Sequence, residues 1–273
     1  MAEWIEIADG VLQARYEPLD VSICLVRGDD RLLLVDTRSN PREARELVDD
    51  VAGLGIGEIR RFVNTHAHYD HSFGNQVFAE LPGFGHRGIP AHFAEFETPR
   101  LEAWNADPEA QPQYDWREVR PTPPGTLIDA PTELELGGRR VRLLPLGPGH
   151  TDTDLVVHVP DADVWIVGDV VEESGPPMYG SGSFPLDWPA VLFALAEQID
   201  DDAIVVPGHG RPVDRAFVVE QAAALDAVAQ AIRVGHARTE PIEYVIERGA
   251  GASGIPEGMV EVAVLRGYAQ LNG

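Results

Sequence analysis

The sequence predicts an α/β protein in which two β-sheets pack face to face and helices cover their outer sides. Short apolar runs bounded by turn residues occur in both halves of the 273-residue chain, which is the pattern of strands separated by turns. In each half, these runs are followed by segments with helix start signals. Strands first and helices afterwards, repeated twice, favour two packed sheets with helices outside.

In the first half, apolar runs lead up to the first predicted helix. Asn40 is a typical helix N-cap, Pro41 fits the first turn, and Glu43 can complete a capping box, so we expect a helix over 41–55. The expected strands of this half are GVLQARYEP (10–18), VSICLVRG (21–28) and RLLLVDT (31–37), with a hairpin turn at 28–30, and then RRFVNT (60–65).

The middle of the chain is expected to be less regular. SFGNQVFAEL (72–81) has a helical pattern, and GIPAHF (88–93) has that of a short strand. Seven prolines in 97–131 predict an irregular segment. A loop of this length inside a compact domain usually covers a site or is mobile.

The second half repeats the order of strands and then helices. Because the strand pattern resumes directly after the irregular segment, we expect one domain over 1–273, with a core over about 8–215 and C-terminal helices over 213–273. The expected strands are TELELGG (132–138), RRVRLLPLG (139–147), LVVHVPDADVWIVGD (155–169) and AIVVPGHG (203–210). The expected helices cover 187–199, 214–235 and 258–271.

Composition limits the classes of partner. The chain has 45 acidic residues and 21 basic ones, all arginine, for a formal net charge of −24. Such a charge repels phosphate backbones and anionic membranes, so we expect a small-molecule substrate and neither nucleic acid nor membrane as partner. No apolar run approaches the ~20 residues of a membrane span. A single cysteine, Cys24, and an acidic N-terminus without signal-peptide features predict a cytoplasmic protein.

The stretch NTHAHYDH (64–71) places four metal-competent side chains directly after an apolar strand. Imidazole and carboxylate groups suit zinc, iron or manganese. If the strand continues through THAH, His66 and His68 point to the same side. Asp70 and His71 can then face a second position at the start of the following helix, so one loop could supply ligands to two metals.

Three further candidates follow apolar runs and are preceded by glycine. His150 ends LGPGH, Asp169 ends VWIVGD, and His209 lies in IVVPGHG. Functional side chains commonly lie on loops at the ends of strands, where a rigid sheet holds them. The shared arrangement of strand, glycine and candidate ligand predicts that these three residues join the first four.

The motifs HAHYDH, GPGHT, VGD and PGHG, in this order and spacing, resemble those of the metallo-β-lactamase superfamily of metallo-hydrolases. The resemblance covers the chain from LLLVDT to about residue 215 and implies a single metallo-β-lactamase-like domain. Its fold would be an αββα sandwich of two mixed β-sheets flanked by helices, with the metal site at one edge. The pattern implies a first metal site of His66, His68 and His150, and a second site of Asp70, His71 and His209. Asp169 would bridge them.

The resemblance also implies a mechanism. Two divalent ions, taken first as zinc with iron or manganese as alternatives, would share a bridging hydroxide that attacks the substrate. Asp70 would also act in catalysis by orienting that hydroxide or moving its proton, and Asp36 and Thr65 would support the ligand histidines. The glycine- and proline-rich segment 172–188 is expected to form a lid, in which Tyr179 is a candidate substrate contact.

These features favour a dinuclear hydrolase of a small ester, thioester or lactone. True β-lactamases of this fold lack the bridging aspartate, which argues against β-lactam hydrolysis as the main role. The segment HTDTD (150–154) departs from the Thr-Pro-Gly that follows this histidine in typical lactonases and glyoxalases. Alternatives are a phosphodiester hydrolase, a mononuclear iron persulfide dioxygenase using His66, His150 and Asp169, and a non-catalytic relative. The natural substrate, the metal and the oligomeric state stay open.

Overall fold

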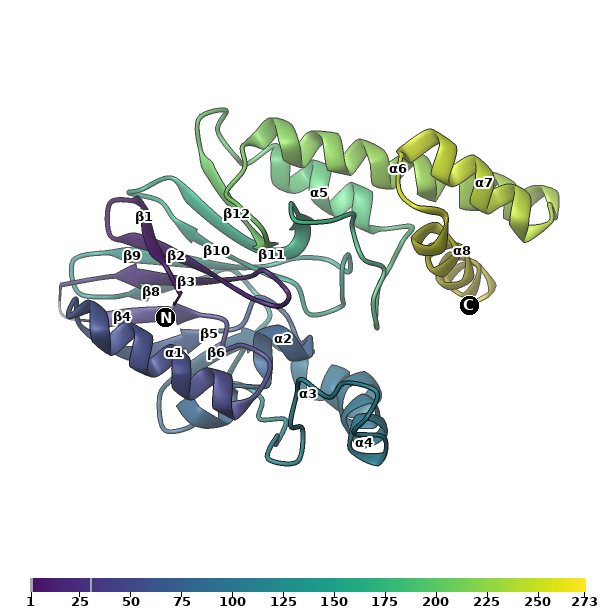
Figure 1. Ribbon diagram of the computed structural model, residues 1–273. Coiled ribbons are helices and arrows are strands. Elements are labelled where there is room, and N and C mark those ends of the chain that lie inside the picture. Colours follow the sequence, from purple (N-terminus) through teal and green to yellow (C-terminus); the bar gives the residue numbers. More distant parts are fainter. Residues whose placement is uncertain (1, 30) are drawn as a thin grey trace.

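The computed structural model describes residues 2–29 and 31–273, and Figure 1 shows its strands stacked in layers between helices. The end of the predicted hairpin turn, at residue 30, lies outside the described residues. The first half-sheet contains β1 (Trp4–Ala8), β2 (Val11–Tyr16), β3 (Val21–Arg27), β4 (Arg31–Val35), β5 (Glu58–Val63), β6 (Gly83–His86) and β7 (Thr126–Ile128). The second contains β8 (Thr132–Glu135), β9 (Arg140–Pro145), β10 (Leu155–Val159), β11 (Val164–Glu172) and β12 (Ile204–His209).

Both half-sheets are mixed. In the first, β1 to β4 pair antiparallel and β4 to β7 pair parallel. In the second, β8 to β11 pair antiparallel, and β11 pairs parallel with β12. The halves join through β3 and β12, which pair at one position, Val21 opposite His209. This join lies beside one of the predicted site residues.

Helices cover the two outer faces, as predicted. On the first half-sheet lies α1 (Pro41–Leu54), and on the second lie α5 (Trp188–Ala196) and α6 (Arg215–Arg238). Two further helices, α7 (Ile242–Ser253) and α8 (Glu257–Asn272), pack against α6. The predicted αββα fold class is therefore confirmed, and α7 is an element that the sequence reading missed.

The inner layer is a continuous apolar core between the half-sheets. Cys24, Val35 and Val63 of the first half-sheet contribute to the same buried cluster as Leu143 and Ile166 of the second. Cys24 is therefore a core side chain. Burial of such residues on both sheet faces accounts for the near-continuous apolar strands.

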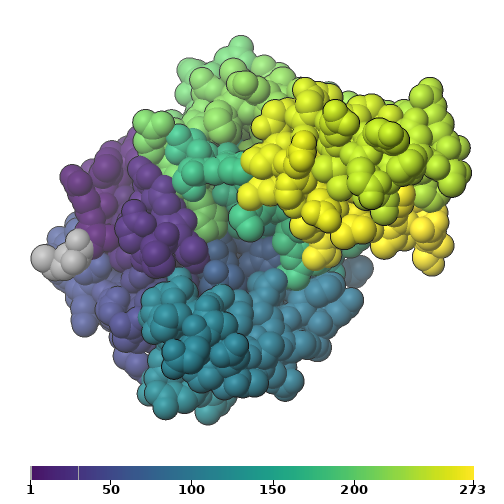
Figure 2. All heavy atoms as spheres, turned by 45° about the vertical axis from the view of Figure 1, so that its right-hand side comes forward, coloured from purple at the N-terminus to yellow at the C-terminus, as the bar shows by residue number. Residues whose placement is uncertain are grey.

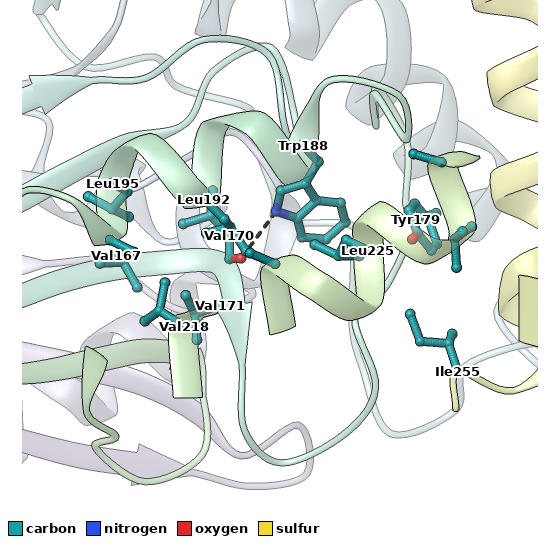
Figure 3. Packing of buried hydrophobic residues seen from close by; sticks show 14 of the residues in the cluster. Val167, Val170, Val171, Tyr179, Trp188, Leu192, Leu195, Val218, Leu225 and Ile255 are labelled. Atoms are coloured by element: carbon teal, nitrogen blue, oxygen red, sulfur yellow. Dashed lines mark hydrogen bonds between the residues drawn. The ribbon is translucent and has the colours of Figure 1, made fainter. Parts of the chain in front are cut away.

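Trp188 anchors the outer layer on the second half-sheet. It has no exposed surface and packs among Val170, Leu192 and Leu225, and its indole Nε1 donates a hydrogen bond of 3.1 Å to the carbonyl oxygen of Val170 (Figure 3). The same ring lies 5.2 Å, centroid to centroid, from His150. The packing of α5 therefore extends to a predicted site residue.

The start of α1 agrees with its sequence signals. The side chain of Asn40 accepts a hydrogen bond of 3.0 Å from the backbone N–H of Glu43, and Pro41 lies in the first turn. The carboxylate of Glu43 accepts from the N–H of Ser39, one residue before the expected capping-box partner. The helix ends before Gly55, whose φ of 65° suits glycine.

The region between 69 and 131 differs most from prediction. The expected helix 72–81 is instead two short turns, α2 (Tyr69–Ser72) and η1 (Asn75–Phe78). The expected strand 88–93 is wrong, because this segment begins a helical run of α3 (Ile89–His92), η2 (Phe93–Glu97) and α4 (Thr98–Ala106). Pro90 and Pro99 lie in first turns, where a missing N–H costs little. The segment 97–131 thus contains α4 and β7 as well as irregular chain.

Two short strands also escaped prediction, β1 and β6. Within β6, a Cβ at Gly83 would lie 2.2 Å from the Phe62 ring, and one at Gly85 would lie 2.6 Å from Ile89. These glycines therefore allow close packing and do not mark turns. Among the described residues, none of the helices combines the length and apolarity needed to cross a membrane.

We expect Trp188→Ala to lower the free energy of unfolding by about 3–5 kcal/mol, because it empties a buried indole volume. It also removes one of two hydrogen bonds to the Val170 carbonyl, the other coming from Gln221 Nε2. Urea denaturation followed by circular dichroism measures the change. The matched control is Phe193→Ala on the same helix, whose side chain is 39% exposed, and it should lose far less. Equal losses would contradict the anchoring role of Trp188.

Candidate metal centre

Seven side chains singled out by the sequence lie together at one edge of the sandwich, and none exposes more than 9% of its surface. They are His66 and His68 after β5, Asp70 and His71 on α2, His150 after β9, Asp169 in β11 and His209 at the end of β12. The expectation that Asp169 follows its strand needs adjusting, because β11 continues to Glu172 with shifted register around Gly168.

The first group consists of His66, His68, His150 and Asp169. Each offers one ligand atom, and these atoms all lie within 4.8 Å of one another. His150 Nε2 is 2.9 Å from His68 Nδ1 and 3.4 Å from Asp169 Oδ2. His66 Nε2 is 3.6 Å from the same carboxylate oxygen. Three imidazoles and a carboxylate at this spacing could hold a metal ion.

The second group consists of Asp70, His71 and His209, with ligand atoms again within 4.8 Å of one another. His209 Nε2 is 3.4 Å from Asp70 Oδ2 and 3.3 Å from His71 Nε2. Asp169 borders this group too, since its Oδ1 is 3.0 Å from His71 Nε2 and its Oδ2 is 3.4 Å from His209 Nε2. One carboxylate therefore lies between two groups that could each hold a cation.

A glycine of β12 makes room for that carboxylate. A Cβ at Gly208 would lie 1.8 Å from Asp169 Oδ1 and 2.8 Å from its backbone nitrogen. No side chain can occupy this position unless Asp169 moves. The sequence pattern suggests only a loop at the glycine before His209. In the structure, this glycine is required because two strands approach each other closely.

The Asp36 carboxylate supports the centre through its contacts with His71 and Thr65. Its Oδ2 lies 2.8 Å from His71 Nδ1 and accepts a hydrogen bond from Thr65 Oγ1, while its Oδ1 accepts from the Thr65 N–H. Asp36 has φ of 66°, which is strained for a residue with a side chain. Asp36 thus contacts one ligand histidine and fixes the ring orientation of His71, and Thr65 Oγ1 lies 3.1 Å from Nδ1 of another, His66.

His68 is held from its other side by a network that the sequence reading missed. Its Nε2 is 3.0 Å from the Ser181 carbonyl and 3.3 Å from the Ser181 hydroxyl. That hydroxyl donates to Oε1 of the fully buried Glu97 over 3.1 Å and accepts from Arg100 over 2.5 Å. Glu97 and Arg100 belong to the segment predicted to be irregular, so no periodicity pointed to them.

The charges of the centre balance one another. Burial alone would lower the pKa of His71 and His209, but Asp169 and Asp70 raise both well above the ordinary histidine value. Burial opposes ionisation of Asp70 as well, yet the two histidines hold its pKa at about 2. By contrast, burial lowers the pKa of His150 to about 4 and also lowers that of His66.

The donor set fits a metal ion on two observations. His66 Nε2 is a buried atom without a hydrogen-bond partner, although it lies within the cluster. Leaving such atoms unsatisfied costs about 1–3 kcal/mol each, which a coordinated cation would remove. In the first group, burial lowers the pKa of His66 and His150, which favours the neutral imidazoles that metal ligands need.

A cavity of about 480 Å³ opens over the two groups. Its floor contains side chains of both groups together with Glu172, whose pKa is raised by burial and then by Asp169. Apolar side chains form much of its wall, and Arg100 is its one arginine among the described residues. The apolar wall residues are Leu19, Tyr69, Trp104, Pro176 and Met178.

Tyr179 does not line this cavity, although its neighbours Met178 and Gly180 do. Its ring is 4% exposed, belongs to the outer core cluster and packs edge-on against Trp188 at 5.4 Å (Figure 3). This placement does not support the predicted contact between Tyr179 and substrate.

Glu172 lies at the end of the same strand as Asp169. The sequence did not single it out, because an acidic residue after an apolar run is common at the end of a strand.

The sequence matches the model of the metallo-β-lactamase superfamily over residues 16–209. Over 202 residues it is 29% identical to an acyl-coenzyme A thioesterase, MBLAC2, of Gallus gallus, covering 69% of this chain and 72% of that protein. Over 190 residues it is 26% identical to a metallo-β-lactamase type 2 of Bacillus cereus, covering 69% of this chain and 66% of that protein. The chain thus spans about two thirds of the length of these curated relatives.

Solved structures share the fold at low identity. A metallo-β-lactamase from Pontibacter korlensis superposes with a TM-score of 0.66 at 18% identity, covering 81% of this chain and 99% of that one. A double mutant of the sec-alkyl sulfatase PisA1 superposes with a TM-score of 0.77 at 15% identity, covering 98% of this chain and 50% of that one. The C-terminal helices lie beyond the residues that the superfamily model matches.

We expect Gly208→Ala to displace Asp169 and to lower the zinc bound per chain at least about tenfold, since its Cβ would overlap the carboxylate. Elemental analysis after dialysis against buffered zinc measures the metal. Gly251→Ala is the matched control, because a Cβ there meets nothing within 4 Å. Full zinc content in Gly208→Ala would show that Asp169 is not held as described.

We also expect the affinity for zinc to rise with pH. The raised pKa of His71 and His209 means that both stay protonated near neutral pH, so an entering cation must expel these protons. Two released protons give up to about a hundredfold gain in affinity per pH unit. Competition with a chelating dye at pH 6.5 and 7.5 measures it, and an affinity independent of pH would contradict the charge balance.

Proposed function

The chain belongs to the metallo-β-lactamase superfamily, and on that premise we propose that it is a metal-dependent hydrolase of a small ester, thioester or lactone. The observation that carries this proposal is the convergence of seven buried side chains into two adjoining groups that share Asp169. The cavity above them could admit a substrate to both groups at once.

In this proposal the two groups hold two divalent metal ions, most simply zinc. His66, His68 and His150 hold one, and Asp70, His71 and His209 hold the other, with Asp169 shared. Nitrogen and oxygen donors of this kind also suit iron or manganese. The raised pKa of His71 and His209, caused by Asp169 and Asp70, supports the assignment, because it marks a place where positive charge is favoured.

When bound, the metal pair would lower the pKa of a water molecule and polarise the substrate carbonyl. We assign to Asp70 the role of orienting the attacking water and accepting its proton. Asp70 lines the cavity, and its Oδ2 lies 3.4 Å from His209 Nε2. Asp36 keeps the His71 ring turned toward the centre, and the hydroxyl and carbonyl of Ser181 do the same for His68.

The cavity wall supports a substrate with an acyl or alkyl portion. Tyr69, Trp104 and Met178 present apolar surface beside the polar floor, which suits a carbonyl compound whose reacting group faces the floor. The thioesterase named among the relatives supports thioesters as the first class to test. A β-lactam stays in the test panel because another relative is named a metallo-β-lactamase.

We expect zinc-replete protein to hydrolyse at least one ester, thioester or lactone of a panel that also contains β-lactams and phosphodiesters. His66→Ala and Asp169→Ala should lower kcat/KM at least about a hundredfold and lower the bound zinc, because each removes a donor. Turnover, elemental analysis and circular dichroism check activity, metal and folding. His236→Ala is the control, since this partly exposed histidine at the end of α6 lies outside both groups.

Other outcomes separate the alternatives. Unchanged turnover in both alanine variants would refute the metal mechanism. One iron per chain with sulfur-dependent oxygen uptake would instead indicate a persulfide dioxygenase. Metal binding without turnover of any panel member would favour a non-catalytic relative.

A further inference from the structure

Glu172 is a buried acid in the floor of the cavity, outside the seven candidate ligands. It is 7% exposed and lines the cavity together with Asp169 and His209. By contrast, Figure 2 shows that the segment of α4, which supplies Arg100 and Trp104 to the cavity wall, lies at the molecular surface below the C-terminal helices. Glu172 therefore faces the interior of the site.

Strand pairing places Glu172 beside a candidate ligand. In the parallel pairing of β11 with β12, Glu172 lies opposite His209, and the next N–H, that of Glu173, donates to the His209 carbonyl over 3.1 Å. From α6, Gln221 accepts from the Glu172 N–H over 2.9 Å and donates to the Val170 carbonyl over 2.9 Å. The backbone at this strand end is thus held from both sides.

An irregularity in β11 turns Glu172 toward the cavity. Residues three apart in a regular strand point to opposite faces of the sheet, so Asp169 and Glu172 would not face the same side. The pairing register shifts between Gly168 and Glu172, and both acids line the cavity. Such bulges are frequent next to active sites, where they redirect a side chain.

The carboxylate of Glu172 lacks a partner of its own. One of its oxygens lies within 4.8 Å of ligand atoms of Asp169 and His209, the same spacing as within the two groups of the centre. Among the residues that the structure describes, none donates a hydrogen bond to this carboxylate or forms an ion pair with it. A buried carboxylate without a donor is unfavourable, and two ionised carboxylates this close repel. A divalent cation between them would remove both costs.

We propose that Glu172 is an eighth donor of the centre and makes the second group a site for a harder, six-coordinate ion such as manganese(II), while the first group holds zinc. This inference rests on the proposed two-metal centre and specifies which ions it takes. With Glu172, the second group combines three carboxylates with two imidazoles, whereas the first combines three imidazoles with one carboxylate. Carboxylates suit manganese, and a four-donor set rich in imidazole suits zinc.

The first experiment titrates manganese(II) chloride into protein loaded with one equivalent of zinc, and electron paramagnetic resonance measures the free manganese. We expect the wild type to bind about one manganese per chain. Glu172→Gln, which keeps the size but removes the charge, should bind it at least about tenfold more weakly. Glu173→Gln is the matched control and should stay within twofold, because Glu173 pairs with Arg211 and lies outside the groups and the cavity lining.

The second experiment measures the melting temperature of the same zinc-loaded proteins with and without manganese. Manganese should raise the melting temperature of the wild type and of Glu173→Gln, and raise that of Glu172→Gln less, since a ligand stabilises a protein according to its affinity. If Glu172→Gln fails to fold, Glu172→Asp replaces it, because the shorter side chain keeps the charge but not the reach.

Manganese binding that is equal in Glu172→Gln and the wild type would overturn the eighth donor. Wild-type protein that takes up no manganese beside zinc would do so as well. Unchanged manganese binding with lower turnover in Glu172→Gln would also overturn it, because Glu172 would then act on the substrate.

The two proposals can fail separately. If manganese binds through Glu172 but no ester, thioester or lactone is hydrolysed, the hydrolase proposal fails and the eighth donor stands. If the protein hydrolyses a member of the panel but Glu172→Gln binds both metals as tightly as the wild type, the hydrolase proposal stands and the eighth donor is wrong.

Discussion

The arrangement of the centre depends on one buried carboxylate, that of Asp169, which needs positive charge on all sides. An ionised carboxylate removed from water is costly by several kcal/mol unless charges and donors surround it. Here four histidines of the two groups approach it from three segments of the chain, and β12 places a glycine where any side chain would collide with it. The register shift within β11 turns this residue toward the centre.

Charge is distributed differently at the surface and inside. The net charge of −24 is carried mostly by solvated carboxylates, whereas the carboxylates of the centre are each matched by a buried imidazole. Glu97 is matched instead by Arg100 and lies outside that group. A substrate therefore meets a floor whose aspartates are matched by histidines and, in the wall, the fixed cation Arg100, so charge as well as shape limits what enters.

The sequence predicted the parts of the fold and the site that depend on local patterns. HAHYDH lies on one strand end and one short helix, so its four side chains converge by local geometry alone. Each of the three later residues follows a glycine, with His150 after β9, Asp169 within β11 and His209 at the end of β12, and topology brings them to the same edge. Glu172 and Glu97 were not predictable in this way, because their importance comes from neighbours far away in the chain. The helical run that begins at Ile89 was not predicted, because prolines usually interrupt helices. Here the prolines lie in first turns, where a helix tolerates them.

The segment that follows Asp169 links the shape of the cavity to the geometry of the centre. Five residues of this segment line the cavity, namely Ser174, Gly175, Pro176, Met178 and Gly180. The next residue, Ser181, bonds to both His68 and Glu97. Glu97 in turn holds Arg100, which lines the same cavity. A change in this wall that moved Ser181 would therefore also move the ring of His68 and the wall cation. Because these groups share hydrogen bonds, the shape of the cavity and the geometry of the centre cannot vary independently.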